Sequence, residues 1–137
     1  MSLTTWEKEF YPITAKEFEK GANDRTLVDH SLRKWRGLRI ENLRRHNLIQ
    51  EGCQIAGGGF LEIDNRSCAL CARYLHPGGM CDGCPIVEVR GDRCDNKKDG
   101  EDESPYHLFT CFSNPEPMIT LLEEALAVQK ARENDRT

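Results

Sequence analysis

The chain has 137 residues, which suits a single domain and leaves little room for a second. Hydrophobic residues make up 38% of it, charged residues 31% and aromatic residues 7%, so we expect a modest apolar core. The net charge of −4 argues against a dedicated nucleic-acid-binding protein, because such proteins are usually basic. No apolar run approaches the ~20 residues needed to cross a bilayer, and the first ten residues do not have the form of a secretory signal. We therefore expect one cytoplasmic domain over residues 1–137.

Residues 1–24 are expected to form an N-terminal arm with one short helix. The sequence Thr14-Ala-Lys-Glu17 has the form of a capping box, in which the Thr and Glu side chains bind free amides of the first helical turn. A short helix is therefore predicted to begin near residue 15. The Gly-Ala-Asn-Asp sequence of residues 21–24 indicates a break before the next element.

Residues 25–49 are expected to be helical, with an apolar face opposite a basic face. The apolar residues at helical spacing are Val28, Leu32, Trp35, Leu38 and Leu43. The opposite face collects His30, Arg33, Lys34, Arg44 and Arg45. Gly37 leaves open whether the segment is one helix or two. A solvated outer surface is the ordinary interpretation of such a basic face, and a docking surface for phosphate or for an acidic partner is the alternative.

The middle of the chain changes from helical to extended character. Residues 57–59 are three glycines, which cannot remain in a stable helix, and residues 60–64 alternate as a short strand does. A phosphate-binding P-loop is excluded, because its lysine and Ser/Thr are absent. Residues 95–104 are acidic without the spacing of a calcium loop, so they are expected to form a mobile, solvated loop.

The last predicted element is a long helix over residues 117–131. Asn114-Pro-Glu-Pro117 is typical of a helix start, because proline is tolerated in the first turn. The apolar side of this helix is expected to include Ile119, Leu122 and Leu126.

Seven cysteines carry the strongest functional signal in the sequence. Cys68-x-x-Cys71 and Cys81-x-x-Cys84 are two tight pairs separated by nine residues. Zinc prefers four thiolate or imidazole ligands in a tetrahedron, and two such pairs close that shell as a structural site does. An odd number of cysteines in a cytoplasmic protein favours a metal over disulfides. The sequence therefore predicts one structural Zn²⁺ ion, bound in a knob over residues 67–94.

Two other ligand sets remain open at this stage. Cys68, Cys71, His76 and Cys81 have the spacing of a zinc knuckle, although the aromatic residue and glycines usual within a knuckle are missing. Cys94 is a second alternative ligand, and it would leave one of the four cysteines as a packed thiol. His107 with Cys111 is a further possible pair, but Cys53 and Cys111 are most simply interpreted as core residues. A thioredoxin-like redox role requires a βαβ unit, which the sequence does not predict around either pair.

The cysteine block also carries a resemblance to a known group of proteins. The residues that carry this resemblance are Ser31-Leu-Arg-Lys-Trp35 with Gly37-Leu38, Cys68-Ala-Leu-Cys71, Cys81-Asp-Gly-Cys-Pro-Ile86, Gly91-x-x-Cys94 and Ser104-Pro-Tyr106. This pattern resembles small cysteine-rich, zinc-binding proteins encoded by tailed bacteriophages and prophages, over roughly residues 27–130. The resemblance implies that five cysteines matter, Cys94 included, and that His76 does not. It also implies a bacterial host cytoplasm, and it implies no activity.

These patterns together predict a mainly α fold of the α+β class. Amphipathic helices are expected to surround a short strand and the cysteine-rich zinc knob, and Pro105-Tyr106 is expected to pack back on that knob. No histidine has the spacing of a known hydrolytic motif, and the zinc deaminase signature is absent, so we do not expect an enzyme. A small zinc enzyme remains the remotest alternative.

Two binding functions remain. The first is a zinc-stapled module that binds a host or phage protein, and the second is a nucleic-acid-binding protein that uses the basic face of residues 25–46. The negative net charge favours the first. In either case the candidate partner-binding residues are Arg33, Lys34, Arg44 and Arg45.

Overall fold

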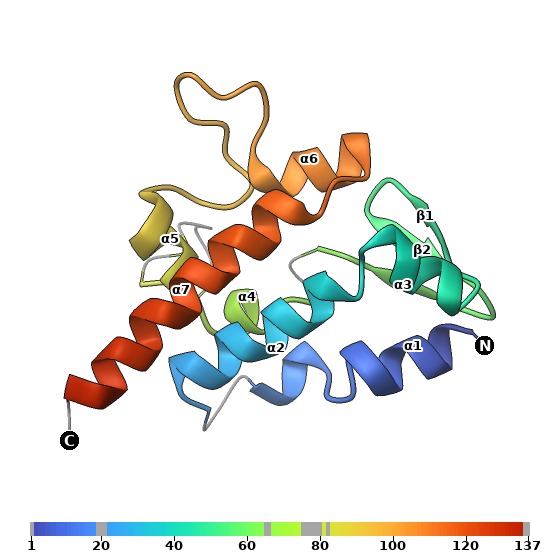
Figure 1. The fold of residues 1–137 in the computed structure, drawn as a ribbon, viewed down its shortest axis with the longest axis horizontal. Coiled ribbons are helices and arrows are strands. Elements are labelled where there is room, and N and C mark those ends of the chain that lie inside the picture. The colour runs from blue at the N-terminus through green and yellow to red at the C-terminus, as the bar shows by residue number, and fades with distance from the viewer. Residues whose placement is uncertain (1, 19–21, 65–66, 75–80, 82, 136–137) are drawn as a thin grey trace.

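The computed structural model describes residues 2–18, 22–64, 67–74, 81 and 83–135 (Figure 1). As the sequence predicts, this part of the chain is mainly helical with a long C-terminal helix, and in place of the single predicted strand it has one small antiparallel sheet. The helices are α1 (Leu3–Phe10), a 3₁₀ turn (Ala15–Phe18), α2 (Asp24–Arg36), α3 (Ile40–Arg45), α4 (Ala69–Tyr74), α5 (Pro85–Arg90), α6 (Pro105–Phe112) and α7 (Glu116–Asp135). The strands are β1 (Ile49–Glu51), β2 (Gln54–Ala56) and β3 (Phe60–Glu62). None of the described helices combines the length and the apolar composition needed to cross a membrane.

The N-terminal region is more ordered than the predicted arm. The short helix expected near residue 15 is present as the 3₁₀ turn, but residues 3–10 also form α1, which the sequence analysis did not predict. Thr5 supplies the local reason, because its hydroxyl accepts a hydrogen bond from the Ser2 amide at 2.9 Å and donates one to the Ser2 carbonyl at 2.8 Å. Leu3 and Trp6 are buried, so α1 is held mainly by tertiary packing.

Gly37 divides the predicted 25–49 helix into two. The Asn23 side chain caps α2 by accepting from the Thr26 amide at 3.0 Å. The helix ends at Arg36, and the Trp6 indole donates to the Gly37 carbonyl at 2.8 Å. A methyl group at Gly37 would overlap the Phe10 ring, so α1 can approach the junction of α2 and α3 only because this residue has no side chain.

The sheet is a three-stranded antiparallel meander in the order β1-β2-β3. β3 occupies the predicted strand region, whereas β1 and β2 are three-residue strands that the sequence analysis did not predict. Ile55 pairs with Gln50 and Leu61 and is fully buried, so this row faces the core. The Leu3 amide donates to the Gly57 carbonyl at 2.8 Å, which fastens the start of α1 to the glycine turn between β2 and β3.

Helix α7 spans 20 residues and is the central element of the helical packing. It lies alongside α2 and also packs against α5 and α6 (Figure 1). Its buried side chains include Ile119, Leu122 and Ala125, all three of which the helical spacing in the sequence identifies. The helix ends at Asp135, four residues beyond the predicted end at 131.

Residues 95–104 form a loop between α5 and α6 that is mostly exposed apart from the buried Ser104, and Arg90 makes hydrogen bonds to it. The Arg90 guanidinium, whose side chain is 5% exposed, donates to the Asn96 carbonyl at 2.8 Å and to the Glu101 carboxylate. Lys98 donates back to the Arg90 carbonyl at 2.8 Å. The acidic loop is therefore solvated as predicted, but a buried cation and a return hydrogen bond fix its course.

Candidate metal centre

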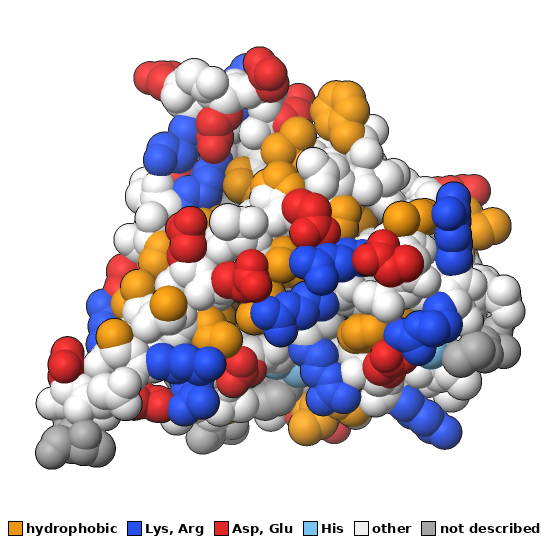
Figure 2. Space-filling view, viewed as in Figure 1, with side chains coloured by type: hydrophobic (Ala, Val, Ile, Leu, Met, Phe, Trp, Pro, Cys, Tyr) orange, Lys and Arg blue, Asp and Glu red, His pale blue; other side chains and the backbone are white. Residues whose placement is uncertain are grey.

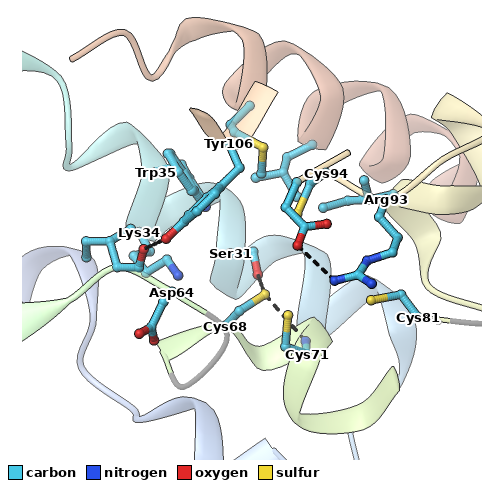
Figure 3. Close-up of a pocket in the computed structure, with 15 residues that line it drawn as sticks. Ser31, Lys34, Trp35, Asp64, Cys68, Cys71, Cys81, Arg93, Cys94 and Tyr106 are labelled. Carbon is cyan, nitrogen blue, oxygen red and sulfur yellow. Dashed lines mark hydrogen bonds and ion pairs between the residues drawn. The ribbon is translucent and has the colours of Figure 1, made fainter. Parts of the chain in front are cut away.

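Four cysteines from three separate segments line one cavity of about 330 Å³ between α2, α4, α5 and α7 (Figure 3). Cys68 and Cys71 come from the start of α4, Cys81 from the approach to α5, and Cys94 from the residues after α5. Ser31, Lys34 and Trp35 on α2 form one wall of the cavity. Apolar side chains of α5 and α7, namely Ile86, Met118 and Leu122, form another.

The cavity includes three of the four predicted ligands and one alternative. Cys68, Cys71 and Cys81 line it, and Cys94 stands where the sequence analysis placed Cys84. Cys84 is 7% exposed and precedes Pro85, the first residue of α5. The other alternative ligand, His76, lies outside the described residues.

Cys84 lies close enough to this cluster to be affected by its charge. Burial, reinforced by negative charge on Cys68 and Cys81, raises the pKa of the Cys84 thiol to about 12. Backbone amides of Ile86 and Val87 act in the opposite direction, because they donate hydrogen bonds to its sulfur. Amides directed at a sulfur in this way also stabilise a thiolate that binds a metal.

Cys68 is the cysteine whose surroundings most favour a thiolate. The Cys71 thiol donates to its sulfur, and this hydrogen bond is the main cause of a lowered Cys68 pKa. The Cys71 amide also donates to Cys68 Sγ at 3.4 Å, and the Ser31 hydroxyl lies 3.9 Å from it. The same shared proton raises the pKa of Cys71. Of the two sulfurs, that of Cys68 is therefore the one whose surroundings favour loss of the proton.

Lys34 is buried beside this pair, which corrects the sequence-based prediction that it belongs to an exposed basic face. Its side chain is 1% exposed, and its ammonium donates to the Ser67 carbonyl at 2.9 Å and to the Ser67 hydroxyl at 3.4 Å. Burial lowers the pKa of Lys34, whereas negative charge on Cys68 and Cys71 raises it. The prediction is wrong because α2 contacts α1, α4 and α7, so more than one of its faces is covered.

The other residues of the predicted basic face do not form one free surface either. Arg33 donates to the Glu9 carbonyl at 2.6 Å, and Arg45 makes a bidentate ion pair with the Glu9 carboxylate at 2.8 and 2.6 Å. Arg44 is exposed, whereas His30 is only 9% exposed. Acidic side chains alternate with the basic ones over the face seen in Figure 2. The surface is therefore mixed in charge.

The far wall of the cavity combines an ion pair with a tyrosine. Arg93 Nη2 lies 2.8 Å from Asp95 Oδ2, and both residues line the cavity on the side of Cys81 and Cys94 (Figure 3). The Tyr106 amide donates to the Cys94 carbonyl at 3.0 Å, and its hydroxyl donates to the Ile63 carbonyl at 2.6 Å. The predicted packing of Tyr106 on the cysteine-rich knob is thereby confirmed.

The two remaining cysteines lie elsewhere. Cys53 is partly buried, and its thiol donates to the Glu62 carboxylate at 3.1 Å. Cys111 is exposed on α6, so its assignment to the core is wrong. His107 on the same helix pairs with the Ser104 hydroxyl at 2.7 Å, at the helix start.

The donor set fits zinc in type and in number, since four thiols face one enclosed space and a fifth lies beside it. Their side chains line the cavity without converging on one point. Within the described residues, no group of three or more His, Cys, Asp or Glu side chains is placed so that it could hold a metal ion. A single ion would therefore require the thiols to turn inward.

Comparisons with protein-family models, curated proteins and solved structures find no match to this chain, so the site has to be interpreted from its geometry and chemistry.

Proposed function

We propose that this chain is a structural-zinc module that binds another protein. One Zn²⁺ ion, held by cysteine thiolates, would fix residues 63–106 against α2 and α7. The observation that carries the proposal is that Cys68, Cys71, Cys81 and Cys94, which come from three separate segments, line one cavity. Zinc between thiolates is typical of small domains whose apolar core is insufficient, because metal binding then supplies folding free energy.

Both proposed ligand sets contain Cys68, Cys71 and Cys81. Cys94 lines the cavity directly and is favoured as the fourth ligand, with Cys84 as its alternative. When bound, the zinc ion would supply a fixed tetrahedral cross-link and no open coordination position. The chain's own contribution is to hold the thiolates, to exclude water with Trp35 and Leu122, and to direct amides at the sulfurs.

A protein partner is favoured over nucleic acid by the surface of the domain. Lys34 is buried, and several exposed arginines are paired with carboxylates, as in Arg36–Glu123 and Arg39–Glu116. A phosphate backbone would have to break these pairs before it could bind. By contrast, the outer face of the sheet exposes Ile49 and Phe60, which flank Ala56 in register. Exposed apolar side chains in one row are a common feature of protein-binding surfaces. The resemblance to phage and prophage proteins suggests a host or phage protein as the partner.

The metal is tested by native mass spectrometry of the untagged chain, with and without a chelator. One zinc per chain that is lost together with folded structure supports the proposal. A mass lower by two hydrogens per cysteine pair, without metal, means disulfides and overturns it. Iron with acid-labile sulfide would instead assign an iron–sulfur cluster to the cavity.

The partner class is tested with two matched pairs of assays. Phe60→Ser removes the exposed ring, and Phe112→Ser removes an equally exposed ring on α6 as a control. A partner that is cross-linked to the wild type and to Phe112→Ser but lost with Phe60→Ser supports the proposal. A salt-sensitive gel shift with single-stranded or duplex nucleic acid, unaffected by Phe60→Ser, would support the alternative function instead.

A further inference from the structure

Lys34 is the one described lysine that is buried, and its contacts leave its charge without a matching anion. The ammonium donates to two oxygens of Ser67 and lies 5.8 Å from the centre of the Trp35 ring. Both Ser67 oxygens are neutral. No carboxylate of the described chain lies within ion-pair distance of Lys34 Nζ. Burying a cation among neutral groups is strongly unfavourable unless an opposite charge lies nearby.

The groups that face Lys34 across the cavity are mainly thiols. Cys68, Cys71, Cys94 and Asp64 line the cavity together with Lys34, and negative charge on any of them would stabilise the ammonium. Three of these four are proposed zinc ligands. Neutral thiols would provide almost no compensating charge, whereas four thiolates around Zn²⁺ carry a net charge of −2. The same cavity that suits the metal therefore also contains the missing anion for Lys34.

Arg93 does not need this anion to the same degree. It lines the opposite side of the cavity, but the Asp95 carboxylate is already paired with it at 2.8 Å. Of the two cations at the cavity, Lys34 is thus the one without an ion-paired carboxylate, and three of the four acidic groups near it are cysteines of the centre.

We propose that Lys34 is the buried counter-charge of the metal centre, and that it favours a shell of four thiolates over a shell with a neutral histidine ligand. This inference rests on the proposed function. It assigns Lys34 a positioning role, since the ammonium acts on the metal through the sulfurs and the Ser67 backbone rather than by binding the ion. It also replaces the docking role that the sequence suggested for this residue.

The role has a distinctive energetic signature. In the metal-free protein the buried ammonium is unfavourable, and a methionine of similar length in its place would be neutral or stabilising. In the metal-loaded protein the same substitution removes an attractive interaction with the anionic centre. Lys34→Met should therefore weaken zinc binding without weakening the metal-free fold. A residue that only fills space would affect both in the same direction.

The experiment compares the full-length wild type with Lys34→Met and with Arg44→Met, which removes the same charge from an exposed position. Zinc affinity is measured by competition with a chromophoric chelator, and the stability of the metal-free form by urea unfolding. We expect Lys34→Met to lower zinc affinity by about 10- to 100-fold, the usual effect of losing a group that supports metal ligands. We expect one zinc per chain to remain, metal-free stability to be unchanged or higher, and Arg44→Met to match the wild type.

A double-mutant cycle provides a readout that does not depend on a folded metal-free state. Cys71→His replaces one thiolate by a neutral ligand and reduces the charge of the centre from −2 to −1. The affinity lost on removing Lys34 should be smaller in that background. Equal losses in both backgrounds, equal affinities of Lys34→Met and Arg44→Met, or a parallel loss of metal-free stability would each overturn the inference. A wild type that binds no metal overturns the proposed function itself and is recognised before any variant is compared.

Discussion

The two halves of this molecule are filled in different ways. The helical frame of α1, α2, α3 and α7 is closed by large apolar side chains, and Trp6, Leu27 and Leu122 are fully buried within it. The described residues between 63 and 106 instead line a cavity together with α2 and α7, and its walls carry four thiols, the Lys34 ammonium and an ion pair. Apolar burial can hold the first region without assistance, whereas the second combines buried side chains such as Ile63, Leu70 and Ile86 with an open space beside them. A metal ion bound in that space would stabilise this segment, as buried apolar side chains stabilise the helical frame.

Metal removal should separate the two regions most strongly. We expect a chelator to abolish amide protection in residues 83–106, because their thiol anchors are lost, while α2 and α7 keep more of theirs. Hydrogen exchange followed by mass spectrometry measures both regions in one experiment. Equal loss of protection in both regions would show that the frame also depends on the metal, and the contrast drawn above would then fail.

Single cysteine substitutions should give the next largest effect and identify the ligands. A structural zinc site contributes on the order of 10 kcal/mol or more, so loss of one thiolate of four is expected to lower zinc affinity roughly a hundredfold or more. Cys94→Ser should show this loss, and Cys84→Ser should show a smaller one, as judged by chelator competition. Cys111→Ser, at an exposed thiol, is the matched control and should bind zinc as the wild type does. If Cys84→Ser lowered zinc affinity more than Cys94→Ser, the fourth ligand would be Cys84, as the sequence predicts.

Within the frame, Gly37→Ala should destabilise the protein without touching the metal. The added methyl would overlap the Phe10 ring and force α1 away from the α2–α3 junction, at a cost of about 1–3 kcal/mol. Urea unfolding of the zinc-loaded protein measures the loss, and zinc stoichiometry should stay at one. Gly52→Ala is a suitable control, since a methyl there meets no other atom, although the positive φ of 59° adds some strain of its own. A change in zinc affinity with Gly37→Ala would mean that the two regions are more tightly coupled than their packing indicates.

The smallest predicted effect is a pH dependence at the junction of α1 and α3. Hydrogen bonds from Arg45 and then His46 lower the pKa of Glu9 from 4.5 to about 2. A lowered folded-state pKa means that the carboxylate stabilises the fold fully above about pH 4.5 and loses this contribution as the pH falls towards 2.

The measurement is the difference in unfolding free energy between the wild type and Glu9→Gln. We expect it to be small, because Glu9 is exposed, constant above pH 5, and absent near pH 2. Acid also protonates thiolates, but it does so in both chains, so the difference isolates Glu9. A difference that persists unchanged at pH 2 would contradict the assignment.

The sequence predicted the elements whose burial follows a simple period. Val28, Leu32 and Trp35 mark the inner face of α2, and Ile119 and Leu122 mark that of α7, as expected from their helical spacing. The three-residue strands β1 and β2 are too short to carry a periodic signal. Helix α1 was missed because its burial depends on contacts with Gly37 and Gly57, which are distant in sequence.

The sequence predicted which residue types form the candidate site, but it did not predict how buried or charged their surroundings are. The C-x-x-C spacing identified Cys68, Cys71 and Cys81, since spacing alone brings such pairs together. It favoured Cys84 as the fourth ligand, whereas Cys94 lines the cavity, because the position of Cys94 depends on where α5 ends relative to α7. Lys34 was misassigned because a charged residue opposite an apolar face is normally exposed, and only the packing of α4 against α2 shows otherwise.

The chain's two tryptophans lie in different parts of the fold. Trp35 forms part of the cavity wall and makes edge-to-face contacts with Phe109 and Tyr106 at 5.0 and 6.4 Å. Trp6 lies instead against Phe10 beneath the α2–α3 junction. Replacing either by phenylalanine would leave a protein with a single tryptophan, whose emission can be excited selectively. The emission of one such protein would follow events at the thiols, and that of the other would follow the docking of the first helix, without any external label.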